Sequence, residues 1–142
     1  EYFDTYFNCI SKLLKADGKA VIQAITINNH RYDDYRRSVD FIKRYIFPGG
    51  CLPSLHVISG SLTRTTDMQI INLRDIALDY ARTLQHWHDA FMADLDAVKA
   101  LGFDEKFIRM WCFYLSYCEG GFRERIIGTY QITMAKPYYR PK

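Results

Sequence analysis

The chain has 142 residues, of which 49% are hydrophobic, 25% are charged and 15% are aromatic, and its formal net charge is +3. This length corresponds to about one ordinary domain, and the composition is that of a globular protein rather than a disordered one. The charge is too small to identify nucleic acid or anionic lipid as a partner. No apolar run approaches the ~20 residues of a membrane-spanning helix, and the first residues lack the basic flank and apolar core of a signal peptide.

The cysteine and histidine spacings do not match a zinc site, so we expect no metal centre. No two cysteines are spaced as Cys-x-x-Cys, and His86 and His88 are two residues apart in a predicted helix, where their side chains diverge. We expect reduced, mostly buried thiols in a cytoplasmic protein. The four cysteines are Cys9, Cys51, Cys112 and Cys118.

The first 27 residues are predicted to form a helix followed by a buried strand. Apolar residues recur at spacings of three and four from Phe3 to Leu14, which predicts an amphipathic helix. Asp4 is a candidate cap for its start, and Gly18 is expected to end it. Residues 19–27 (KAVIQAITI) are β-rich and apolar on both faces. A strand buried on both faces directly after a helix is typical of a parallel α/β sheet.

The rest of the chain is expected to continue the alternation of helices and strands. Ser54 is a candidate cap for a short helix that runs to Gly60, and Asp104 for a helix that ends at Gly120 and Gly121. The tail from residue 136 is expected to fray. The pattern predicts further helices over residues 34–45 and 75–100, an irregular segment over residues 47–54, and strands over residues 68–73 and 127–135.

Three strands are few for an α/β domain. A first strand buried on both faces expects parallel neighbours, yet no strand precedes residues 19–27. The chain also starts almost inside a helix and without an initiator Met. We therefore expect a segment of a longer protein.

The sequence contains no common phosphate-binding or nucleophile motif. Gly-x-Gly-x-x-Gly, the Walker loop and Gly-x-Ser-x-Gly are all absent. The charged run over residues 31–37 contains acids that nearly offset its bases, which favours a solvated helix start over a nucleic-acid surface. Gln23 is the unusual residue, because an amide buried without partners costs roughly 1–3 kcal/mol. It is expected either to bond side chains of a neighbouring strand or to line a polar site.

Several segments, in order along nearly the whole chain, resemble the cyclopropane-fatty-acyl-phospholipid synthase family. Because four separate segments agree in sequence, the likeness is far more specific than one short motif. The segments are residues 38–54 (SVDFIKRYIFPGGCLPS), residues 79–87 (DYARTLQHW) with Phe91, residues 107–123 (FIRMWCFYLSYCEGGFR) with Ile127, Gly128 and Gln131, and residues 2–7 (YFDTYF) with 14–18 (LKADG).

The resemblance implies an S-adenosylmethionine-dependent methyltransferase with a Rossmann-like sheet of seven strands and a reversed final hairpin. Residues 1–142 would then be the C-terminal half of a single methyltransferase domain, supplying its last three strands and their helices. The glycine-rich cofactor loop of the family, and an acidic residue that helps to bind bicarbonate, would lie upstream of Glu1. We therefore expect no cofactor-binding residues in this chain.

In the family, a methyl group is added to a cis double bond of a phospholipid acyl chain, and bound bicarbonate then removes a proton so that a cyclopropane ring closes. The resemblance assigns bicarbonate contacts to Gln23, to the backbone of Ile25 and to the hydroxyl of Tyr80, and it makes Gln23 and Tyr80 the catalytic residues. Phe47 and Tyr114 are expected to line the substrate pocket.

Gln23 stands where the family more often has a histidine. A carboxamide can hydrogen-bond bicarbonate, but it cannot carry a proton at neutral pH. The product could therefore be a cyclopropane or a methyl-branched chain. Two other hypotheses stay open: a methyltransferase of the same fold that acts on another small molecule, and a non-catalytic fragment that associates with itself through an unpaired strand edge.

The partners implied are an unsaturated phospholipid at the inner face of the membrane and, through the unpaired edge, further copies of the chain. The location implied is cytoplasmic and peripheral to the membrane, with no nucleic acid involved. The 142-residue chain alone is expected to be inactive and to bind no S-adenosylmethionine.

Overall fold

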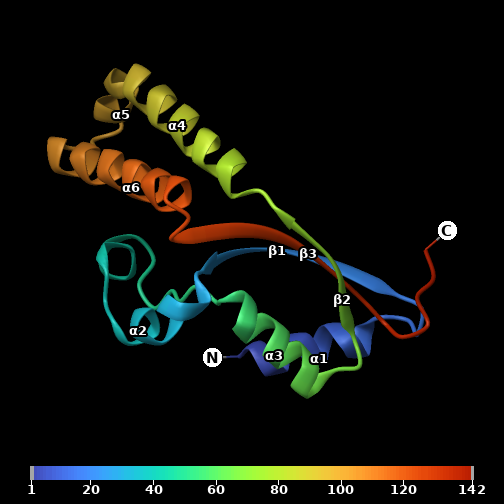
Figure 1. The fold of residues 1–142 in the computed structure, drawn as a ribbon. Helices are drawn as coiled ribbons and strands as arrows, with labels where there is room; N and C mark the ends of the chain where they lie inside the picture. The colour runs from blue at the N-terminus through green and yellow to red at the C-terminus, as the bar shows by residue number, and fades with distance from the viewer. Residues whose placement is uncertain (1, 142) are drawn as a thin grey trace.

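The computed structural model describes residues 2–141 as a small sheet with helices on both sides (Figure 1). Helices α1 and α3 lie on one side of the sheet, and the pair of α4 and α6 lies on the other side at one end. The elements in chain order are α1 (Phe3–Leu13), β1 (Lys19–Ile27), η1 (Asn29–Arg31), α2 (Tyr32–Arg37), η2 (Ile42–Ile46), α3 (Leu55–Thr65), β2 (Gln69–Asp75), α4 (Ala77–Ala93), α5 (Leu95–Ala100), α6 (Glu105–Arg123) and β3 (Ile127–Ala135). The predicted α/β class is confirmed.

The last strand in sequence is the central strand of the sheet. The strand order is β1-β3-β2, and both neighbours pair with β3 in the antiparallel direction. Consequently β1 and β2 run in the same direction without touching. The parallel neighbours expected for residues 19–27 would lie upstream, so the described residues do not test that prediction, whereas the reversed final strand implied by the family resemblance is present.

Strand β1 forms an edge of this sheet, and much of one of its faces is bare. Within residues 2–141 its outer edge has no partner strand. Val21 is 60% exposed and Gln23 is exposed, whereas Thr26 and Ile27 at the far end are buried. The prediction that both faces of this strand are buried is wrong for the described residues, because α4 and α6 cover only the far end of that face.

The first core joins α1 and α3 to the covered face of the sheet. Alternate residues of β1 and β3 contribute to it, as expected for a strand with one face inward. Its fully buried members are Phe7, Ile58, Leu62, Met68, Ile132 and Met134. The hydroxyl of Ser54 accepts a hydrogen bond from Val57 N (3.2 Å), so the predicted cap of α3 is confirmed, although the helix runs five residues past Gly60.

The second core lies between α4, α6 and the far end of the sheet. Asp104 caps α6 as predicted, because its Oδ1 accepts a hydrogen bond from Phe107 N (2.8 Å). The buried members of this core are Ala77, Ala81, Leu84, Leu115 and Phe122, with Ile25, Tyr80 and Tyr114 packed against them. The end of β1 thus meets the start of α4 and the middle of α6.

Several predicted helix boundaries differ from the structure. Asp4 does not cap α1; its carboxylate instead binds Ser61 and Arg64 of α3 (2.6 Å each), which ties the two helices together. The helix predicted over residues 75–100 is two helices that meet at Asp94, and the one predicted over residues 34–45 is α2 followed by the single π-helical turn η2. Helix α6 continues through Gly120 and Gly121 to Arg123.

Two other expectations need correction. Cys9 and Cys51 are exposed, and Cys112 and Cys118 are only partly buried, so the thiols are not mostly buried. The tail does not fray at its first residue, because Lys136 Nζ binds Asp67 Oδ1 (2.5 Å) and Ser11 Oγ (3.1 Å). Among residues 2–141, no helix is long and apolar enough to cross a membrane.

Candidate functional site

The register of the sheet puts a row of polar side chains on the face of β1 that faces α4. Gln23 of β1 stands directly opposite Gln131 of β3, and Gln131 stands opposite Arg74 of β2. Directly paired residues share a face of the sheet, so these three side chains emerge on the same side. Along the strands, this row is two residues away from the pair of Ile25 and Thr129, where the second core begins.

The start of α4 brings Tyr80 to this row. Asp75 Oδ1 accepts a hydrogen bond from Ala77 N (2.8 Å), and Ile76 N donates to Thr129 O of β3 (2.9 Å). These bonds fix the direction in which α4 leaves β2. The ring of Tyr80 packs on Phe122 of α6, with ring centroids 5.4 Å apart.

Gln23, Gln131 and Tyr80 form a chain of side-chain hydrogen bonds. Gln131 Nε2 donates to Gln23 Oε1 (3.2 Å), and Gln23 Nε2 donates to the hydroxyl of Tyr80 (3.4 Å). Both alternatives for Gln23 therefore hold, since its amide bonds a side chain of the neighbouring strand and also forms part of a polar cluster. Gln23 is not buried, however, so the desolvation cost on which that expectation rested is absent.

The amide of Ile25 points away from the sheet. Ile27 N donates outward to Pro53 O (2.9 Å), and Ile25, two residues earlier in the same strand, presents its N–H on the same side. The partner of Ile25 across the sheet is Thr129, whose carbonyl oxygen accepts from Ile76 on the β2 side. This is the pattern of a non-hydrogen-bonded pair, which leaves the Ile25 N–H free of β3. The second half of β1 thus offers a backbone N–H and the Gln23 carboxamide, and the start of α4 adds the hydroxyl of Tyr80.

Phe47 and Tyr114 also lie together. Their ring centroids are 6.2 Å apart in an edge-to-face arrangement, and Tyr114 packs in turn on Trp111 (5.0 Å). A pocket of ≈ 340 Å³ opens between α4 and α6 beside these rings. Its lining residues are Trp87, Ala90, Phe91, Trp111, Tyr114 and Leu115. Of the two predicted substrate residues, Tyr114 lines this pocket and Phe47 packs on Tyr114 beside it.

The aromatic pocket and the polar row are neighbours. Burial raises the pKa of Tyr114, and the charges that Cys118 and Tyr80 would carry raise it further, so Tyr114 stays neutral at neutral pH. Tyr80 and Tyr114 also pack against the same buried cluster. All five predicted residues thus lie on the second core or at its rim.

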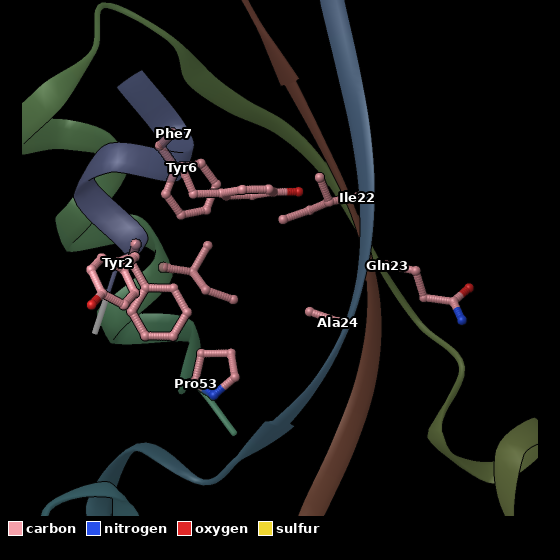
Figure 2. A pocket seen from close by; sticks show the side chains of 9 residues that line it. Tyr2, Tyr6, Phe7, Ile22, Gln23, Ala24 and Pro53 are labelled. Atoms are coloured by element: carbon pink, nitrogen blue, oxygen red, sulfur yellow. The ribbon is translucent and has the colours of Figure 1, made fainter. Parts of the chain in front are cut away.

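A second pocket lies mainly on the opposite face of β1, and Gln23 is one of its lining residues. It has a volume of ≈ 320 Å³ and is bounded mainly by aromatic side chains of α1, by Ile22 and Ala24 of β1 and by Pro53. Figure 2 shows the carboxamide of Gln23 pointing to the other side of β1, away from this pocket. The Gln23 carboxamide therefore points away from the space between α1 and β1.

Sequence reasoning did not assign a role to Gln131. It is 108 positions from Gln23 and meets it only because β3 inserts between β1 and β2. The one sequence signal was its place in a family-like segment. Among residues 2–141, no group of three or more His, Cys, Asp or Glu side chains is arranged to hold a metal ion.

Cys118 provides a test of burial on the inner side of α6. Burial, together with the charge of Asp40, raises the pKa of its thiol to about 11. The thiolate is the reactive form, so at pH 8 we expect Cys118 to react about 100-fold more slowly than in the unfolded chain. The rate should rise about tenfold per pH unit up to pH 10.

Alkylation followed by mass spectrometry of the individual cysteines measures this rate, with exposed Cys9 as the control that reacts first. Equal labelling of Cys9 and Cys118 at pH 8 would contradict the packing of α6.

Comparisons with known proteins place the chain in a family. Residues 1–132 match the sequence profile of the family described as mycolic acid cyclopropane synthetase. The tuberculostearic acid methyltransferase of Mycobacterium tuberculosis is 40% identical over 131 residues, which is 92% of this chain and 31% of that protein. The cyclopropane-fatty-acyl-phospholipid synthase of Escherichia coli is 34% identical over 135 residues, which is 94% of this chain and 33% of that protein.

Solved structures show the same arrangement. The mycolic acid cyclopropane synthase CmaA1, solved with SAH and CTAB, superposes with a TM-score of 0.82 at 28% identity, covering 95% of this chain and 50% of that one. The chain therefore spans about a third of the curated relatives and half of the solved structure.

Proposed function

Because the chain belongs to the mycolic acid cyclopropane synthetase family of S-adenosylmethionine-dependent methyltransferases, we propose that it is the C-terminal part of an enzyme that modifies lipids. The reaction proposed is methyl transfer to the double bond of an unsaturated phospholipid acyl chain at the inner membrane surface, followed by closure of a cyclopropane ring. The observation that carries this proposal is the contact between Gln23 and Tyr80, two residues 57 positions apart that the family likeness assigned to one anion site.

S-adenosylmethionine would supply the methyl group. Residues 2–141 contain no glycine-rich loop between a strand and a helix that could hold it. We propose that the cofactor binds mainly to the rest of the protein. By itself the 142-residue chain would then neither bind the cofactor nor catalyse the reaction, and the open edge of β1 would favour self-association.

The donors at the end of β1 suit a small anion such as bicarbonate. When Tyr80 accepts from Gln23 Nε2, the hydroxyl hydrogen of Tyr80 and the second N–H of Gln23 remain free to donate. The outward N–H of Ile25 adds a third donor. An anion held there would act as the base that removes a proton from the added methyl group.

The aromatic residues beside this site have a separate part in the proposal. Addition of a methyl cation to a double bond leaves positive charge on the acyl chain, and aromatic faces attract such charge. The rings of Tyr80, Phe122 and Tyr114 lie around the second core, and Phe47 stands beside Tyr114. The pocket between α4 and α6 would hold apolar chain and exclude water.

The test is to give the full-length protein S-adenosylmethionine with a labelled methyl group and vesicles of unsaturated phospholipid. We expect label in the acyl chain, and mass spectrometry then distinguishes a ring from a methyl branch. Failure of any label to enter the lipid would reject the lipid substrate. Label transferred to another small molecule would instead support the same-fold alternative, in which Phe47 and Tyr114 face a different substrate.

A second candidate product is a methyl-branched chain, and one observation favours it. Neither carboxamide of the cluster of Gln23, Gln131 and Tyr80 can take up or release a proton near neutral pH. One relative is named for methyl transfer, whereas another is named for cyclopropane synthesis. The methylated cation would then lose a proton from a neighbouring carbon of the chain to bicarbonate or water, which gives a methyl-branched alkene in place of a ring.

Gln23→His distinguishes the two products. An imidazole with a pKa near 6.5 can carry a proton where the carboxamide cannot. If proton removal limits ring closure, we expect the cyclopropane share of the product to rise severalfold, and to rise further as the pH increases from about 5.5 to 7.5. The product ratio is measured by mass spectrometry of the lipids, with Gln69→His at an exposed position of β2 as the matched control. An unchanged ratio at every pH would show that the residue at position 23 does not decide the product.

A further inference from the structure

We infer that Gln131 is a positioning residue that orients the carboxamide of Gln23, an inference that rests on the proposed function. Gln131 Nε2 donates to Gln23 Oε1 (3.2 Å) from the central strand. Gln131 would touch neither the lipid nor the anion. Its role would be to decide which end of the Gln23 amide faces Tyr80 and the site.

The direction of the hydrogen bonds carries this inference. A carboxamide has a carbonyl oxygen that only accepts and an NH₂ group that only donates, and a 180° turn exchanges the two. Tyr80 does not select between them, because its hydroxyl can accept from Nε2 or donate to Oε1. In this structure Gln131 presents its NH₂ group to Gln23, and that donor requires Oε1 of Gln23 on its side. Gln23 Nε2 is then turned toward Tyr80 (3.4 Å).

The selected orientation is the one that suits an anion. With Nε2 toward Tyr80, Gln23 offers a free N–H, and the hydroxyl of Tyr80 keeps its hydrogen for a further acceptor. In the opposite orientation, the Tyr80 hydrogen would be spent on Gln23 Oε1, and a carbonyl oxygen would face the anion. One hydrogen bond from β3 therefore keeps two donors available.

The two glutamines differ in how firmly they are held. Gln131 is half-buried on a strand that is paired on both sides, whereas Gln23 is exposed on an edge strand. An exposed glutamine without a partner samples several rotamers, and ordering it costs conformational entropy. The hydrogen bond from Gln131 thus restricts the rotamers of the Gln23 side chain, which its position on an edge strand leaves free.

A double-mutant cycle in the full-length enzyme tests the inference. The variants are Gln131→Met, which keeps the length of the side chain and removes its donor, Gln23→Ala, and both together. Methyl transfer to unsaturated phospholipid vesicles is measured while bicarbonate is titrated. We expect Gln131→Met to raise the bicarbonate concentration for half-maximal rate about tenfold, the scale of one lost hydrogen bond. In the Gln23→Ala background, the same change should have no further effect.

Gln69→Met, at an exposed position of β2, is the matched control and should leave the bicarbonate titration unchanged. Thermal unfolding of every variant identifies any loss that comes from misfolding. An equal cost of Gln131→Met in both backgrounds, or no cost in either, would overturn the positioning role while the proposed function stands. If Gln23→Ala itself changes neither rate nor bicarbonate dependence, the anion site of the proposed function fails, and the role of Gln131 fails with it.

Discussion

Replacing Tyr80 with phenylalanine is expected to lower kcat/KM for methyl transfer by the full-length enzyme about 10- to 100-fold. The change removes only the hydroxyl. The ring therefore keeps its packing on Phe122, with ring centroids 5.4 Å apart, and the start of α4 keeps its place. Gln23 Nε2 loses its acceptor, and the anion loses a donor. Hydrogen bonds to charged groups are worth about 1.5–3 kcal/mol, and each 1.4 kcal/mol is a tenfold change in rate.

Tyr117→Phe is the matched control. Tyr117 lies on α6 and packs on Phe41 and Phe113, away from the polar row, so loss of its hydroxyl should leave the rate within about twofold. Transfer of labelled methyl groups to lipid gives the rates, and unfolding by denaturant checks that both variants are folded. Equal rates for the Tyr80→Phe variant and the wild type would remove Tyr80 from the catalytic residues.

The fold could be predicted from sequence where local pattern decides it. The bounds of β3 agree with the prediction because apolar and polar residues alternate over residues 127–135. The division of α4 from α5 at Asp94 could not be predicted, since the apolar stripe passes through Leu95 without interruption. Two apolar faces indicated a strand covered on both sides, yet part of one face of β1 is bare here, because composition does not reveal which neighbours are present.

The site depends on strand order, which no local pattern contains. Spacing gives no reason for Gln23 and Tyr80 to meet, and only the family resemblance put them together. Glutamine is common on protein surfaces, so its residue type gives Gln131 no special meaning in the sequence. Its partner becomes evident only when β3 is inserted beside β1. The family resemblance therefore pointed to Gln23 of β1 and Tyr80 of α4, and the sheet topology added Gln131 of β3.

The packing beneath Tyr80 is the second place where a large effect is expected. Phe122 is 2% exposed, belongs to the second core and supports the ring of Tyr80 from α6. Truncating a buried phenylalanine to alanine removes its transfer free energy and leaves a cavity, at a cost of about 3–5 kcal/mol. We expect Phe122→Ala to lower the free energy of unfolding by this amount. Tyr80 would also lose the surface that holds it 3.4 Å from Gln23, so methyl transfer should fall as well.

Ile58→Ala separates these two effects. Ile58 is also 2% exposed, but it lies in the first core, on the covered face of the sheet and away from the polar row. Its truncation should cost about 2–5 kcal/mol of stability and leave kcat/KM near the wild-type value at a temperature where the variant is folded. Denaturant unfolding and methyl-transfer rates, measured on both variants at that temperature, give the comparison. If Ile58→Ala slowed the reaction as much as Phe122→Ala, the loss would follow from global stability, and the second core would have no particular role in holding Tyr80.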